Sequence, residues 1–138
     1  MHHIGITLLL MTLPVLVSAQ EGDLRGAAER ARRAWFTHDV GALVAESPRL
    51  VIQLPGAEPS VALGPDQAAA LLSNFLDSGQ EVETVVRAAR QVGPSRGYVE
   101  LQRRYRVAGT QNVQRQVLLL GYRRIQGRWT LVEFRVVD

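Results

Sequence analysis

The sequence predicts an α+β domain in which N-terminal helices pack in a strongly curved antiparallel sheet, a cone-shaped, cystatin-like α+β roll. Two observations support this. The hydrophobic pattern changes near Gly79, from helical spacing before it to β-branched and aromatic runs after it. The second half is then divided by turn-forming residues at 93–95, 109–112 and 126–127. Helices followed by a hairpin-connected meander are typical of the α+β class.

The first half predicts two helices before residue 48. Asp23 is placed to cap the first, and its buried stripe consists of Leu24, Ala27, Ala28, Ala31 and Trp35. A second, short helix is expected to start at Asp39, with Val40, Leu43 and Val44 facing inward. Pro48 ends it, because proline cannot continue a helix.

The remaining elements follow from turn residues and apolar runs. A short strand is expected at 49–54, and Pro65 opens a third helix for which Gly79 is the predicted C-terminal cap. Four long antiparallel strands complete the sheet, at 81–92, 96–108, 114–125 and 128–137.

The first 19 residues predict a secretory signal peptide. An uncharged apolar run at 4–17 leads into Val17-Ser18-Ala19, a small-residue pattern suited to cleavage after Ala19. Cleavage would leave residues 20–138 as one exported domain, periplasmic or secreted, with no membrane span. The alternatives are an uncleaved anchor or a misplaced start, because the leading Met1-His2-His3 lacks the usual Lys or Arg.

Missing residue types exclude several chemistries. The chain has no Cys and no Lys, so thiolate nucleophiles, Cys-ligated zinc and Schiff-base lysines are ruled out. His38 is the only histidine after the predicted signal, which is too few for a transition-metal site. No Gly-x-Ser-x-Gly elbow and no dinucleotide-binding glycine fingerprint occurs. We therefore expect no metal and no cofactor.

Three short motifs resemble the nuclear-transport-factor-2-like superfamily, the cone fold of ketosteroid-isomerase-like and SnoaL-like proteins. They are aromatic residues before His38-Asp39, the helix opening Gly64-Pro65-Asp66-Gln67-Ala68, and the closing Gly127-Arg128-Trp129-Thr130-Leu131. Within the superfamily the chain most resembles exported bacterial domains of unknown function. The resemblance implies a bent sheet around a cavity, which hosts isomerases, dehydratases and cyclases as well as pure binding modules.

The residues favour a non-catalytic module that binds a small ligand or an envelope partner protein. An isomerase, dehydratase or cyclase acting in the conical pocket is the alternative, with His38, Asp39 and Tyr105 as its candidate residues. We expect Asp39 to cap a helix and His38 to contact backbone carbonyls at a helix end. The isomerase-like relatives use a tyrosine on the first helix, which is absent here, and two acids. Among the strand carboxylates weighed for the second acid, Glu83, Glu100 and Glu133, none is a clear counterpart.

Arginines stand where strand alternation predicts apolar side chains. Because a buried guanidinium needs a partner, one hypothesis is a polar cluster at the cavity mouth that binds a carboxylate or phosphate. Its predicted ligand-binding residues are Trp35, Arg103, Tyr105, Arg123, Glu133 and Arg135. The alternative places these arginines on the outer sheet face, paired in water.

Charge is divided unevenly along the chain. Residues 20–84 carry five Arg and ten acids, whereas residues 85–138 carry eleven Arg and three acids. For an exported protein this basic sheet predicts anionic lipid, cell-wall polymer or an acidic partner, or a merely solvated face, and nucleic acid is not expected. Residues 117–122 are apolar on both strand faces, which predicts either a homodimer through the sheet or a central strand covered on both sides.

Overall fold

The computed structural model describes Gly5 and residues 15–138, with side chains from Asp23 onward. The predicted signal segment therefore lies largely outside the described residues. Helix α1 (Val15–Phe36) runs through the predicted cleavage site, and cleavage itself stays a prediction. No helix in the described part of the chain has both the length and the apolar character needed to cross a bilayer.

Helix α1 begins earlier than the sequence predicts. Asp23 lies inside it and is not its N-cap, because no proline interrupts residues 15–36 and the helix continues upstream. Its predicted apolar stripe is buried as expected. The helix ends at Phe36 because His38 adopts a left-handed φ of 58°, and the Asp39 amide donates to the Ala34 carbonyl at 2.8 Å.

Helices α2 (Val40–Val44) and α3 (Pro65–Leu76) follow the predicted punctuation at their starts. Asp39 caps α2, since its Oδ1 accepts from the Ala42 amide at 3.0 Å. Pro65 opens α3 as expected. Gly79 does not cap α3, and that prediction is wrong: Gly79 is the first residue of a strand, where a Cβ would lie 2.8 Å from the Tyr105 ring.

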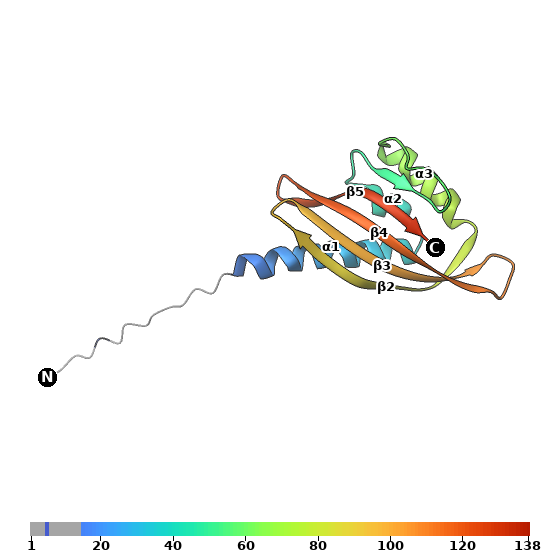
Figure 1. Ribbon diagram of the computed structural model, residues 1–138, viewed down its shortest axis with the longest axis horizontal. Coiled ribbons are helices and arrows are strands. Elements are labelled where there is room, and N and C mark those ends of the chain that lie inside the picture. The colour runs from blue at the N-terminus through green and yellow to red at the C-terminus, as the bar shows by residue number, and fades with distance from the viewer. Residues whose placement is uncertain (1–4, 6–14) are drawn as a thin grey trace.

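Five strands form one sheet in the order β1-β5-β4-β3-β2. The four long antiparallel strands are confirmed, with bounds within two residues of prediction: β2 (Gly79–Val92), β3 (Arg96–Val107), β4 (Val113–Ile125) and β5 (Arg128–Val137). The short strand β1 (Val51–Gln53) is also confirmed, and it adds to the sheet edge parallel to β5. Figure 1 shows the long curved strands crossing the molecule, with the helices gathered on one side of them.

Bulges decide which side chains face the helices. Strand β2 has two extra residues relative to β3, Val82 and Arg87. Because of the extra Val82, Glu81 and Thr84 lie on the same face although they are three residues apart. Glu81 pairs with Tyr105 and Thr84 pairs with Arg103, and both of these β3 residues face inward. Val132 is the extra residue in β5 relative to β4. As a result Trp129 and Leu131 share the inner face with Phe134 and Val136.

The core lies between the inner sheet face and the helices, centred on Trp35. The Trp35 ring is fully buried, stacks on Phe134 with ring centres 5.2 Å apart, and lies 6.3 Å from the ring of Phe75. About three turns earlier in α1, Leu24 packs against Gly97. The part of α1 from Leu24 to Trp35 therefore lies against the sheet.

Gly97→Ala is expected to lower the free energy of unfolding by about 1–3 kcal/mol, since inserting atoms into a packed contact forces neighbours to shift. The new Cβ would lie 2.9 Å from both Leu24 methyls. The matched control is Gly26→Ala within α1, whose Cβ meets only the flexible Arg30 guanidinium, at 3.4 Å. That variant should gain about 0.5–1 kcal/mol from helix propensity. Urea unfolding measures both, and equal effects would contradict the proposed close approach.

Candidate functional site

Arg103 and Glu81 form an ion pair inside the domain. Strand β3 places Arg103 and strand β2 places Glu81 on the inner face, and each side chain is only 2% exposed. Arg103 Nε donates to Glu81 Oε2 at 3.2 Å, and Nη2 donates to Oε1. Arg103 Nη1 donates to Gln116 Oε1 at 2.9 Å. All three guanidinium nitrogens are thus hydrogen-bonded, as a buried arginine requires.

The Glu81 carboxylate is held by further contacts. His38 Nε2 lies 3.3 Å from Oε1, and the Thr84 hydroxyl donates to Oε2 at 3.4 Å. These contacts, together with the fork from Arg103, use both carboxylate oxygens. Glu81 is consequently committed to structure and is not free to act as a general base.

Three aromatic rings enclose the Arg103 guanidinium. Its Cζ lies 4.0 Å from the centre of the Tyr105 ring, 5.1 Å from that of Trp35 and 5.8 Å from that of Phe75. Cation–π attraction is strongest where the cation is desolvated, as it is here. The domain thus has an aromatic cage that is occupied by one of its own side chains.

The network continues to the last residue of the sequence. Gln116 Nε2 donates to Asp138 Oδ1 at 2.8 Å. Through Gln116 the buried pair is connected from the interior to the exposed Asp138. One continuous set of hydrogen bonds therefore joins β2, β3, β4 and the residue after β5.

The structure brings together only part of the predicted ligand-binding cluster. Trp35, Arg103 and Tyr105 meet in the interior. Arg123 and Arg135 are exposed on the outer sheet face, where Arg135 lies 4.0 Å from Glu133. The hypothesis of a single cluster is therefore wrong, for two reasons. Strand alternation turns Arg123 outward. The bulge at Val132 places Glu133 and Arg135 on the face opposite to that of the inward Trp129 and Leu131.

The catalytic candidates are placed apart as well. Asp39 is engaged as the α2 cap. His38 stands at the end of α1 as predicted, but its imidazole contacts the Glu81 carboxylate and not the backbone carbonyls that we expected. The left-handed φ of His38 accounts for this, since it re-aims the side chain away from the helix end.

Sequence reasoning missed Glu81, Gln116 and Phe75. Glu81 was overlooked as a strand carboxylate, and simple alternation could not reveal its partner because Val82 is bulged. Gln116 lies directly opposite Arg103 in the β3–β4 register. That pairing was available from the hairpin at 109–112, and it is the signal that would have identified Gln116.

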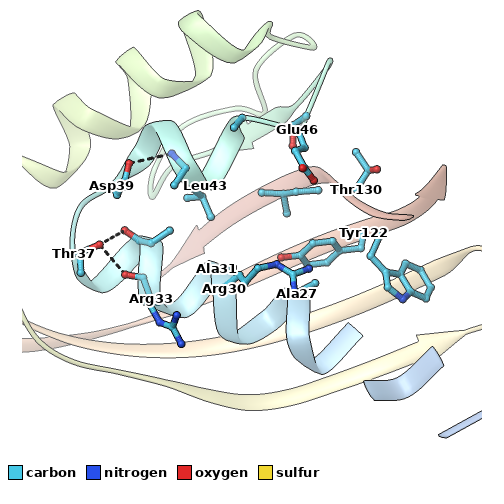
Figure 2. Close-up of a pocket in the computed structure, with 16 residues that line it drawn as sticks. Ala27, Arg30, Ala31, Arg33, Thr37, Asp39, Leu43, Glu46, Tyr122 and Thr130 are labelled. Carbon is cyan, nitrogen blue, oxygen red and sulfur yellow. Dashed lines mark hydrogen bonds between the residues drawn. The ribbon is translucent and has the colours of Figure 1, made fainter. Parts of the chain in front are cut away.

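Open space lies elsewhere, in a groove of about 460 Å³ between α1, α2 and the β4–β5 hairpin. Small side chains of α1, among them Ala27, Ala31 and Ala34, form one wall. Tyr122 and Leu131 line the sheet side. Figure 2 shows Arg30 beside the ring of Tyr122, with Asp39 and Glu46 toward α2. The walls are thus mixed, with apolar side chains from α1 and the sheet and charged groups such as Arg30, Asp39 and Glu46 around them.

Burial raises the pKa of Tyr122 well above its ordinary value of 10.0, and the positive charge of Arg30 opposes that effect only in part. The phenol therefore remains protonated across the physiological range and can donate a hydrogen bond. No hydrogen bond joins its hydroxyl to another of the described side chains or backbone groups. Within the same part of the chain, no group of three or more His, Asp or Glu is arranged to hold a metal ion.

A second hollow, of about 680 Å³, lies on the outer sheet face. Glu133 and Arg135 line it together with Arg90, Tyr98 and Glu100. Its charges are balanced, because each of its two cross-strand rows carries one arginine and one carboxylate: Glu100 with Arg135, and Arg90 with Glu133. This is the arrangement that the outer-face alternative describes for these residues.

Solved structures with a similar fold identify the architecture. A ketosteroid isomerase-like protein from Erwinia carotovora atroseptica superimposes with a TM-score of 0.70 at 17% identity, covering 85% of this chain and 94% of that one. The fold is nuclear-transport-factor-2-like. No family model and no curated protein matches the sequence. The cone fold expected from the sequence is therefore confirmed.

Two further proteins with the nuclear-transport-factor-2-like or cystatin-like fold carry no assigned function. One, from Shewanella oneidensis, has a TM-score of 0.65 at 14% identity and covers 86% of this chain and 99% of that one. The other, a domain with a cystatin-like fold from Nostoc punctiforme, has a TM-score of 0.68 at 15% identity, with coverages of 87% and 77%. At these identities the likeness defines the fold alone.

Arg103→Ala is expected to cost about 3–5 kcal/mol in unfolding free energy, since it leaves Glu81 buried without its cation. Replacing both partners, Arg103→Met with Glu81→Leu, should recover most of that loss. The adjacent Arg104 is the matched control: it is partly exposed, and its pair with Glu83 spans 3.6 Å, so Arg104→Ala should cost less than about 1 kcal/mol. Urea unfolding measures both variants. Equal losses of unfolding free energy in Arg103→Ala and Arg104→Ala would contradict the assignment of Arg103 as a buried, paired arginine.

Tyr122 should make the domain less stable in alkali. Its folded-state pKa is raised, so its contribution to stability is complete below the unfolded pKa of 10.0 and is lost as the pH rises above that value. Tyr122→Phe has no ionisable hydroxyl, so its unfolding free energy should decline less between neutral and strongly alkaline pH. Chemical unfolding across this range measures the difference, with the exposed Tyr98→Phe as control. Parallel profiles for wild type and Tyr122→Phe would refute the prediction.

Proposed function

We propose that this domain is an exported, non-catalytic module that binds a small molecule in the groove between α1, α2 and the β4–β5 hairpin. The observation behind it is the Arg103–Glu81 pair, which fills the interior where a cone-fold enzyme would hold its substrate. The groove is the concave space that remains on the helix side of the sheet, and it combines apolar and polar walls. Export rests on the apolar run at 4–17.

The groove chemistry favours a ligand that has both an apolar part and a hydrogen-bond acceptor. Ala27, Ala31 and Leu131 offer apolar contact. The protonated Tyr122 hydroxyl and the nearby Arg30 offer donors without a matching acceptor of their own. A carbonyl or carboxylate on the ligand would satisfy both groups.

The contact between His38 and Glu81 supports a second candidate, a small proton-transfer enzyme. A carboxylate 3.3 Å from an imidazole is a common way to orient a histidine base, and the His38 side chain is 33% exposed. Against this, Glu81 is already held by Arg103, and Asp39 is held by α2. The binding module is therefore the function that we favour.

A homodimer through the sheet is a further proposal. It rests on Val117 and Leu119, which point to the outer face and are only half-buried in the single chain. A second copy that covered them would account for the apolar character of both faces of β4. Native mass spectrometry of the purified protein is expected to show a dimer, and a monomer at high protein concentration would contradict this proposal.

Native mass spectrometry of the protein purified from a bacterial envelope is expected to show a retained small molecule. Ala42→Trp, on the α2 wall of the groove, should reduce the bound fraction at least tenfold by filling the space. Ala70→Trp, at an exposed alanine on α3, is the matched control and should retain it. Equal occupancy in both variants would rule out the groove. Loss of a measured turnover in a folded His38→Ala variant would favour the enzyme instead.

A further inference from the structure

One end of the outer sheet face combines unpaired arginines with exposed apolar side chains. We call this surface the hairpin-end patch. It lies where the β2–β3 and β4–β5 hairpins turn, and it occupies three successive cross-strand rows. Its members are Arg90, Val92, Arg96, Tyr98, Arg123, Ile125 and Arg128.

The register of the sheet puts like charges face to face in this patch. Arg96 lies directly opposite Arg123 across β3 and β4, and their row continues to Val92 and Thr130 without a carboxylate. Like charges directly opposite each other destabilise a sheet. Neither arginine has an ion pair with any other residue that the structure describes. The fold therefore carries an electrostatic cost here that none of the side chains described by the structure offsets.

The nearest acids do not neutralise the patch. Glu133 is on the same cross-strand row as Arg90 and Tyr98, but its ion pair is with Arg135. Glu46 lies 3.9 Å from Arg128, with both side chains more than three-quarters exposed, so solvent and salt screen that pair. Asp23 borders the same hollow as Arg128. Arg96 and Arg123 are thus the members of the patch that lie farthest from a described acid.

Apolar side chains stand between these arginines. Val92 is 50% exposed, Tyr98 is 49% exposed and Ile125 is 42% exposed, which places them among the most exposed large apolar residues of the described chain. A tyrosine and two β-branched residues among arginines are suited to a surface that is anionic outside and apolar just beneath. Free phosphate groups alone would not use the apolar members.

Helix α1 points toward the same end. Leu24 lies against Gly97 near the start of β3, whereas Trp35 lies against Arg103 farther along it, so α1 runs parallel to β3. The turns before Leu24 therefore extend past the β2–β3 hairpin, as Figure 1 shows for the blue end of the ribbon. The described start of α1 therefore lies at the same end of the sheet as the patch, on the inner side.

We propose that the hairpin-end patch binds the anionic headgroup surface of a lipid bilayer. Arg96, Arg123 and Arg128 would contact lipid phosphates, and Val92, Tyr98 and Ile125 would enter the headgroup layer. This relieves the repulsion between Arg96 and Arg123 and covers the exposed apolar side chains. The groove on the helix side stays open, so the lipid contact and the proposed ligand site operate independently.

Vesicle co-sedimentation of the full chain tests the proposal. Each arginine near an anionic surface is worth on the order of fivefold in binding. Arg96→Gln with Arg123→Gln should therefore reduce the preference for phosphatidylglycerol vesicles over phosphatidylcholine vesicles by on the order of 25-fold. The matched control is Arg104→Gln with Arg115→Gln, which removes a facing pair from the far end of the same strands. Comparing the two lipids cancels any contribution of the apolar N-terminal run.

The control pair should change the preference less than threefold or so, since only charge near the bilayer contributes strongly. Removing the repulsive pair should leave the urea midpoint unchanged or higher, which separates lost binding from lost folding. If both double variants lost the preference for anionic vesicles equally, the preference would depend on net charge alone and the proposal would be overturned. The proposal would also be overturned if the wild-type protein showed no preference for anionic vesicles. Tighter, equally arginine-dependent binding of a single-stranded oligonucleotide would assign the patch to nucleic acid instead.

Discussion

A permanently charged guanidinium inside the core is the constraint on which the rest of this structure depends. Arg103 cannot lose its charge in a protein, so its burial requires an anion, acceptors for its other N–H groups and a tolerant apolar surface. Five elements provide them: Glu81 from β2, Gln116 from β4, Tyr105 from β3, Trp35 from α1 and Phe75 from α3. The register of the sheet and the packing of α1 and α3 on it thus both depend on contacts with the Arg103 side chain.

The same constraint determines where chemistry can take place. A cone fold that hosts catalysis needs unoccupied space and uncommitted acids at its centre. Here Glu81 is saturated by its partners, and Asp39 is used to cap α2. The aromatic cage that would hold a cationic ligand already holds Arg103. The open hollows consequently lie outside this centre, in the groove along α1 and on the outer face of the sheet.

The elements were predictable from sequence where the periodicity was long and the turns were explicit. The four long strands and the start of α3 belong to this class, because Pro65 and the glycine-rich turns fix them locally. The Asp39 cap was also predictable. Asp23 failed because nothing local stops α1 upstream of it, and Gly79 failed because its close approach to Tyr105 is a tertiary contact. Both features depend on neighbours that the local sequence does not contain.

The candidate site was less predictable, because bulges decide it. A single extra residue exchanges the two faces of a strand, and this chain has three such positions, at Val82, Arg87 and Val132. Alternation located Arg103 and Tyr105 correctly on β3, which has no bulge before position 105. Alternation predicted the wrong face for Glu133 and Arg135, because both follow the bulge at Val132. It also did not identify Glu81 as the partner of Arg103, because the bulge at Val82 interrupts the alternation next to Glu81. The wrong placement of Arg123 has another cause: alternation grouped it with its neighbours on β4, but it did not show that this group faces away from the helices.

The uneven charge of the sequence becomes a local asymmetry once the chain folds. Acids of the first half reach across to arginines of the second: Glu81 neutralises Arg103, Glu83 lies near Arg104, and Glu46 lies near Arg128. Neutralisation is complete in the interior and weak at the surface, since solvent screens an exposed pair. Arg96 and Arg123, which face each other at the hairpin ends of β3 and β4, have no such partner among the described side chains. A second facing pair, Arg104 and Arg115, lies at the other end of the same strands. Of these two pairs, only the second has a described acid of the first half beside it, because Glu83 lies near Arg104.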